Sequence, residues 1–202
     1  MTTATPSDGR LCPARALVDL LAGNRRFAAG QPRYGHHVSA AAAASGGQRP
    51  YAVVVGCIDS RVPLEAVFDQ NFGSICVVRS GGHVLDRAVL GSVEFAVGEL
   101  GVSLVLVLGH ERCGAVASTV AALRTGEHPP GNLAYLVEEI APAVWAAGPD
   151  HPDVQARATR GHVARTVRRL EGVELLSAAT AAGRVALAGA VYDLDTGRVT
   201  VV

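Results

Sequence analysis

Apolar residues recur along this chain at two different spacings, which predict strands alternating with helices. Segments 51–57, 74–80 and 103–110 are nearly continuous apolar runs of strand length. Such runs are typical of strands that are covered on both faces of a sheet. Segment 86–101 instead repeats its apolar residues every three or four positions, which indicates one buried helical face. The centre of the chain is therefore predicted to form a β-α-β unit.

The flanking segments extend this alternation on both sides. Segment 13–29 has helical spacing, with a proline at its start and a glycine just beyond its end. Segment 184–194 has the pattern of a final strand, and a polar turn then leads into a short second run. Strands alternating with helices predict an α/β fold, a central and mostly parallel β-sheet flanked by helices. We expect one domain, 1–202, in which 1–46 forms an N-terminal helical arm. Further helices are predicted at 39–45, 114–124, 132–146 and 153–170.

Charge and composition narrow the classes of partner. Eighteen basic residues, all of them arginine, balance 18 acidic ones, so the formal net charge is zero and the footprint of a nucleic-acid binder is missing. No apolar stretch approaches the roughly 20 residues that cross a bilayer. The first ten residues also lack the charged and apolar regions of a secretory signal. We expect a cytoplasmic protein that acts on a small molecule, with no nucleic-acid or membrane partner.

The cysteines and one histidine carry the clearest chemical signal. His110 and Cys113 lie three positions apart, a spacing at which an imidazole and a thiolate can bind the same ion. Taken alone, this pair would more often be a core histidine near a buried cysteine. Cys57 reverses that assessment, because it ends the first predicted strand while His110 ends the third, and such strand ends meet at one edge of a parallel sheet. The set predicts a zinc site with one open position, which is typical of catalytic zinc.

Two charged residues follow Cys57 in the turn CIDSRVP, where Asp59 and Arg61 stand two residues apart. A charged pair in a turn is commonly a solvent-exposed pair with no functional role. Beside a metal, however, a carboxylate either ligates the ion or accepts a proton from its bound water, and a bidentate arginine decides between these by holding the carboxylate away. Asp59 is therefore predicted to be a catalytic residue and an alternative fourth ligand, and Arg61 is predicted to decide between these roles.

The chain resembles the β-class carbonic anhydrases in several segments. The resemblance rests on CIDSRV, on FDQNFGSICVVRSGGHV and SVEFAV, and on GHERCGAV, and it extends from about residue 17 to residue 191. It implies the fold of that family, one Zn²⁺ per chain and a homodimer or homotetramer. The residues that match the family's zinc ligands are Cys57, His110 and Cys113, and those that match its aspartate–arginine dyad are Asp59 and Arg61.

The same resemblance implies reversible hydration of carbon dioxide to bicarbonate and a proton by zinc-bound hydroxide. Asp59 would orient the hydroxide by accepting its hydrogen bond. Gln48 matches a glutamine that hydrogen-bonds substrate in the family, although by itself it is an ordinary loop amide. Gly114 follows a zinc ligand at a predicted helix start, where its backbone N–H offers a further donor to substrate.

Other readings of the sequence remain open. A hydrolase of carbonyl sulfide or carbon disulfide would carry the same fold and zinc site. A non-catalytic zinc-binding or redox-sensing module would have Asp59 capping the metal permanently, and the complete Asp59–Arg61 dyad argues against it. Cys76 is expected to be a small core residue rather than a ligand. His83 and His162 are candidate proton shuttles, and neither is assigned that role.

Overall fold

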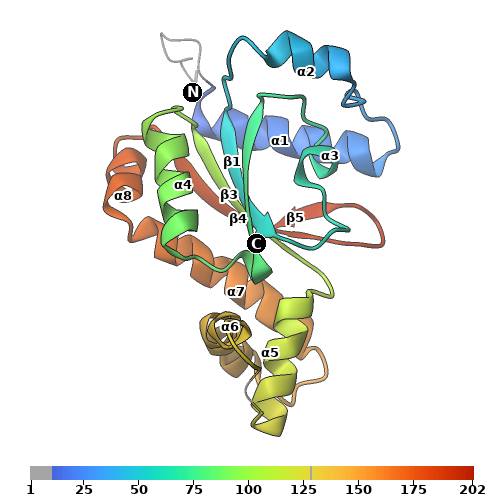
Figure 1. Ribbon diagram of the computed structural model, residues 1–202, viewed down its shortest axis with the longest axis vertical. Helices are drawn as coiled ribbons and strands as arrows, with labels where there is room; N and C mark the ends of the chain where they lie inside the picture. Colours follow the sequence, from blue (N-terminus) through green and yellow to red (C-terminus); the bar gives the residue numbers. More distant parts are fainter. Residues whose placement is uncertain (1–10, 128) are drawn as a thin grey trace.

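The apolar runs form a parallel sheet at the centre of the molecule (Figure 1). The computed structural model describes residues 11–127 and 129–202. Within them the sheet has five strands in the order β2-β1-β3-β4-β5, parallel except for the antiparallel pair β4 and β5. All residues of the interior strands β1 and β3 are buried, which explains their unbroken apolar runs. The strands are β1 (Ala52–Cys57), β2 (Ile75–Ser80), β3 (Leu104–His110), β4 (Ala186–Tyr192) and β5 (Val199–Val201).

Helices cover both faces of the sheet and extend beyond its carboxyl edge (Figure 1). One face carries α1 (Pro13–Ala28) and the short α3 (Leu64–Val67). The opposite face carries α4 (Arg87–Gly98), α7 (Val154–Glu171) and α8 (Glu174–Ala181). Past the carboxyl ends of the strands, α5 (Gly114–Thr125) packs on α6 (Leu133–Ala147), which packs in turn on α7. The remaining helices are α2 (Val38–Ala44), which has no buried residue, and the 3-10 turn η1 (Gly81–His83).

Alternate side chains of the interior strands enter two separate cores, because successive residues of a strand point to opposite faces. Val53 and Val105 pack with residues of α4, α7 and α8. Val54 and Leu106 pack on the other face with α1 and α3. Burial on both faces fixes the register of β1 against β3, since a shift by one residue would exchange the two sets of side chains.

A third core lies at the carboxyl edge of the sheet. It joins the end of β1 to apolar residues of α5, α6 and the first turns of α7. Cys57 and Cys113 are members of this cluster. The predicted metal ligands are therefore built into packed structure rather than placed on a mobile surface.

Most predicted elements are confirmed, with boundaries moved by a few residues. The α/β fold with a mostly parallel sheet is as expected, but α3, α8 and η1 have no counterpart among the predictions because they are short and lack a long apolar period. In the arm predicted at 1–46, α1 buries Ala16 and Leu20 against the sheet of its own chain. Residues 1–10 of that arm lie outside the described part. No helix of the described residues is long and apolar enough to cross a membrane.

Asp69, which follows α3, ties α1 and the segment after it to the sheet layer. Its carboxylate is fully buried and accepts from the Arg26 Nε at 2.5 Å and from the backbone N–H groups of Arg33 and Tyr34 at 2.9 and 3.1 Å. Burial raises the pKa of this carboxyl, but the hydrogen bonds from Arg33 and Arg26 outweigh burial and lower it below the ordinary value.

Replacing Asp69 by asparagine removes the charge and keeps a residue that tolerates the left-handed backbone at this position, where φ is 46°. We expect the free energy of unfolding at pH 7 to fall by about 2 to 4 kcal/mol in urea titrations. A carboxyl whose pKa is lowered by folding stabilises above its unfolded pKa of about 4, and this stabilisation is lost as the pH falls further.

The difference between wild type and Asp69→Asn should therefore shrink at pH 3. A difference of equal size at pH 3 and pH 7 would show that the charge of Asp69 is not what stabilises the fold. Asp19→Asn is the matched control, because Asp19 pairs with Arg15 in an exposed i,i+4 contact and its loss should change stability far less.

Candidate metal centre

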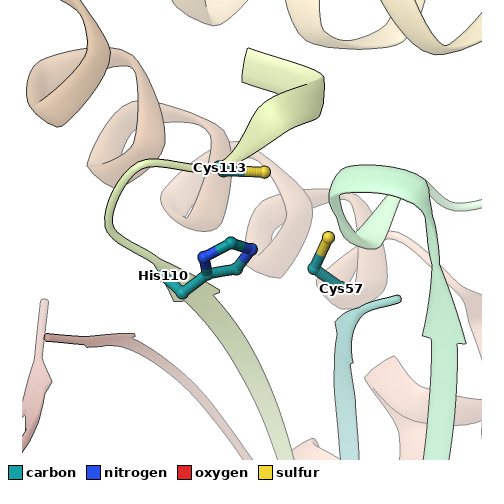
Figure 2. Close-up of side chains that lie close together, drawn as sticks. All are labelled: Cys57, His110 and Cys113. Carbon is teal, nitrogen blue, oxygen red and sulfur yellow. The ribbon is translucent and has the colours of Figure 1, made fainter. Parts of the chain in front are cut away.

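Three side chains converge where β1 and β3 end. Cys57 is the last residue of β1 and His110 the last of β3, while Cys113 immediately precedes α5. The two strands are parallel neighbours, so their carboxyl ends lie together. Figure 2 shows the two sulfur atoms and the imidazole ring directed into one shared space, and the three ligand atoms all lie within 4.8 Å of one another. The convergence predicted from the strand ends is present.

A tight turn between His110 and Cys113 lets both residues face the same point. Arg112 in this turn has φ at 51°, in the left-handed region that few residues other than glycine adopt. Its guanidinium makes a bidentate pair with Asp195, in the turn between β4 and β5, at 2.9 and 2.7 Å. This pair fastens the ligand-bearing turn to a neighbouring loop.

The chemistry of the donor set fits a metal ion. His110, Cys57 and Cys113 are only 1, 5 and 4% exposed. The Nδ1 of His110 lies 2.8 Å from the carbonyl oxygen of Glu111, and because a carbonyl only accepts, Nδ1 carries the proton. The other ring nitrogen, Nε2, is then a buried acceptor with no hydrogen-bond partner, beside two thiols. A bare imidazole nitrogen grouped with two sulfurs is the arrangement that a thiolate-binding divalent metal satisfies.

Hydrogen bonding prepares one cysteine to lose its proton. The Cys113 thiol lowers the pKa of Cys57 most strongly, and the backbone N–H groups of Asp59 and Gly82 lower it further against the effect of burial. The same contact with Cys57, together with burial, raises the pKa of Cys113. Because the thiolate is the form that binds metals, the lowered pKa makes Cys57 a suitable metal ligand.

Asp59 and Arg61 form the dyad that the sequence predicted. The Arg61 side chain donates to both carboxylate oxygens, with Nε 2.9 Å from Oδ1 and the terminal nitrogen 2.7 Å from Oδ2, and its backbone N–H adds a bond of 2.9 Å. These bonds, led by the Arg61 side chain, hold the pKa of Asp59 well below its usual range. Asp59 Oδ2 is also 3.8 Å from the bare Nε2 of His110, so an ionised carboxylate stands at the edge of the centre.

The two predicted substrate-binding positions lie at opposite ends of β1. Gly114 begins α5 beside Cys113, where its backbone N–H has no acceptor within the helix. Gln48 lies four residues before β1 begins, packed near Gly73 at the other end of the strand. The six residues of β1 alone span about 20 Å. The chain therefore does not bring Gln48 to its own Cys57, and its role in substrate binding stays a prediction.

One residue that holds the site has no counterpart among the predicted site residues. The guanidinium of Arg79 donates to the backbone carbonyls of Cys57 at 2.7 Å and Asp59 at 2.6 Å, and so clamps the segment that bears a ligand and the dyad. The sequence feature that could have revealed Arg79 is its position as a charged residue inside the apolar run of β2. Cys76, in the same strand, is half-buried against the core and lies outside the ligand cluster, as expected.

Comparison of the sequence with known proteins assigns this chain to a family. A family model described as carbonic anhydrase matches residues 52–199, which include all three converging side chains. Carbonic anhydrase 2 of Mycobacterium tuberculosis strain H37Rv is 43% identical over 188 residues, which cover 92% of this chain and 91% of that protein. This chain belongs to the β-carbonic anhydrase family. Another member, the carbonic anhydrase of Mycolicibacterium smegmatis, is 43% identical over 200 residues, covering 96% of this chain and 94% of that protein.

Solved structures of β-carbonic anhydrases share the fold. The Coccomyxa β-carbonic anhydrase in complex with acetazolamide superposes with a TM-score of 0.73 at 24% identity, covering 92% of this chain and 86% of that one. A structure from a study of two tetrameric β-carbonic anhydrases of Sordaria macrospora also gives 0.73, at 21% identity and 94% coverage of both chains. The parallel sheet with helices on both faces is thus the β-carbonic anhydrase fold.

Proposed function

We propose that this β-carbonic anhydrase catalyses the reversible hydration of carbon dioxide to bicarbonate and a proton, with one Zn²⁺ held by Cys57, His110 and Cys113. The observation that carries the proposal is the ionised Asp59, held by Arg61 at the edge of a buried Cys2His set. Curated relatives at 43% identity bear the name carbonic anhydrase. Their names favour carbon dioxide over carbonyl sulfide or carbon disulfide as substrate.

The donor set supports zinc in particular. Two thiolates and one imidazole are ligands that Zn²⁺ prefers, and three protein ligands leave the fourth tetrahedral position open. When bound, the ion acidifies water and so supplies a nucleophile near neutral pH. The four cysteines of the described residues are all free, and zinc ligands need reduced thiols, so we also propose a cytoplasmic location.

The Asp59–Arg61 dyad supplies orientation. An ionised carboxylate only accepts hydrogen bonds. Asp59 would therefore orient the attacking water by accepting a hydrogen bond from its O–H group. Arg61 donates three hydrogen bonds to the same carboxylate, which restrains it from turning inward to become a metal ligand. This restraint is the opposite of what a permanently capped, non-catalytic zinc module needs. Gly114 begins α5 next to Cys113, and it offers a substrate oxygen a backbone N–H that has no acceptor within the helix.

Replacing Asp59 by asparagine tests this role directly. The amide can donate as well as accept, so it no longer enforces one orientation of water. We expect stopped-flow CO2 hydration to fall by on the order of 100-fold, with zinc content unchanged because Asp59 is not one of the three ligands. Asp150→Asn is the control, since Asp150 lies on the exposed connection between α6 and α7 and should keep full activity.

Two outcomes would contradict the proposal. Zinc-loaded wild type that hydrates no CO2 at any pH would exclude carbonic anhydrase activity, and carbonyl sulfide hydrolysis measured beside it would reveal the alternative substrate. Equal zinc loss from Asp59→Asn and from Cys57→Ser would show that Asp59 is chiefly a structural ligand.

We further propose a homo-oligomer in which a second copy supplies Gln48. A single chain keeps Gln48 at the far end of β1 from its own metal centre, so only another copy can bring this amide there. Apolar residues left exposed support such an assembly, and so does β2, which lies at one edge of the sheet and whose residues are all half-buried. The exposed residues include Val38, Ile58 and Phe95, which are 85, 64 and 56% exposed. The Sordaria macrospora relatives are described as tetrameric.

Subunit mixing tests whether Gln48 acts across the interface. Cys57→Ser removes a metal ligand and Gln48→Ala removes the amide, so each homo-oligomer should be nearly inactive. In a dimer formed from one copy of each, one site combines an intact metal centre with an intact Gln48 from the other copy. After co-refolding at equal concentration, roughly a quarter of the sites should be complete. Hydration no faster than in the separate variants, or full activity of Gln48→Ala alone, would contradict the proposal.

A further inference from the structure

A buried turn forms a hydrogen bond with the Cys57 sulfur. The backbone N–H of Gly82, in η1, donates to the Cys57 sulfur at 3.4 Å. Gly82 has φ at 59° and ψ at 28°, and a Cβ there would lie 2.9 Å from Ile140 and 3.0 Å from Ala115. The backbone conformation therefore favours glycine, and a larger residue would also crowd Ala115. The conformation of this turn sets the direction of the Gly82 N–H, so a contact that holds the turn also directs the hydrogen bond to Cys57.

The residue that holds this turn is His162, on α7. Its Nε2 lies 3.0 Å from the carbonyl oxygen of Gly82, and because the carbonyl only accepts, Nε2 carries the proton. The imidazole is 1% exposed, and its other nitrogen, Nδ1, has no hydrogen-bond partner. A buried histidine that leaves one acceptor unsatisfied incurs a cost in stability, which points to a role for the bond that it does make.

A second histidine fixes the orientation of this ring. His83 stacks on His162 with ring centroids 4.5 Å apart and planes 22° from parallel. His83 is itself 3% exposed, and its Nδ1 lies 3.4 Å from the Thr166 hydroxyl, one turn further along α7. Such burial leaves neither ring in contact with bulk water, which disfavours the proton-shuttle role that the sequence left open. Stacking and packing instead keep the Nε2–H of His162 directed at Gly82.

We propose that His162 is a positioning residue for the metal centre. By holding the carbonyl of Gly82, it fixes the backbone angles of that residue and so directs the Gly82 N–H at the Cys57 sulfur. A hydrogen bond to a ligand sulfur withdraws charge from it and orients it, and partners of this kind commonly tune metal sites. The inference rests on the proposed zinc site, because the function of the contact is to adjust how Cys57 binds the ion.

Three variants separate this role from simple packing. His162→Leu introduces an apolar side chain of similar bulk that has no donor, whereas His162→Gln places an amide N–H near the former Nε2. Thr159→Val is the matched control, since Thr159 is another buried threonine of α7 and its hydroxyl makes no hydrogen bond to Gly82 or His83. Zinc affinity is measured by chelator competition, and the sulfur-to-metal charge-transfer band is recorded on the cobalt-substituted protein.

We expect His162→Leu to bind zinc at least tenfold more weakly and to shift the charge-transfer band to lower energy, because the sulfur regains charge. His162→Gln should restore both values, and Thr159→Val should leave both unchanged. A wild-type band and affinity in His162→Leu would overturn the inference while leaving the zinc site standing. Wild type that binds no metal would instead contradict the proposed function.

A measurement on the unaltered protein covers the case in which His162→Leu does not fold. Nitrogen-15 shifts of the histidine side chains distinguish the two neutral tautomers. His162 should carry its proton on Nε2 and none on Nδ1. A proton on Nδ1 would leave no donor for the Gly82 carbonyl and would overturn the inference without any substitution.

Discussion

Parallel pairing of β1 with β3 is the constraint on which the whole site depends. The register pairs Gly56 with Leu108, so the next residues, Cys57 and Gly109, and then His110 emerge at the same edge. A shift by one residue would turn the Cys57 side chain to the opposite face of the sheet. Burial of both strands on both faces makes such a shift very costly, and the geometry of the metal centre is therefore set by the hydrophobic core.

Around this frame, backbone-directed hydrogen bonds hold each group that would react or bind. Arg79 clamps the carbonyls on either side of the segment from Cys57 to Asp59, and Arg61 fixes the Asp59 carboxylate. His162 contacts the Gly82 carbonyl, and the Gly82 N–H donates to the Cys57 sulfur. Placing ligands in a packed, hydrogen-bonded shell limits their motion, which is what a catalytic metal site requires.

The sequence predicts the convergence of the three candidate ligands better than it predicts the residues that support them. Cys57 and His110 end long apolar runs, so strand prediction alone brings them together. Arg79 donates to backbone carbonyls, which every residue type has. The sequence therefore contains no complementary side chain that would reveal this contact. His162 lies 80 residues from the carbonyl that it contacts, on a helix whose orientation only packing determines. Gln48 matches a family position, but its distance from the site follows from the length of β1 and is not visible in a motif.

The most direct test of the metal centre is X-ray absorption at the zinc edge of the zinc-loaded protein. Coordination by Cys57, His110 and Cys113 predicts two sulfur atoms at about 2.3 Å and one imidazole nitrogen at about 2.0 to 2.1 Å, with one further light atom at the open position. A first shell made only of nitrogen and oxygen, or one with a single sulfur, would contradict the assignment of these three residues as the ligands.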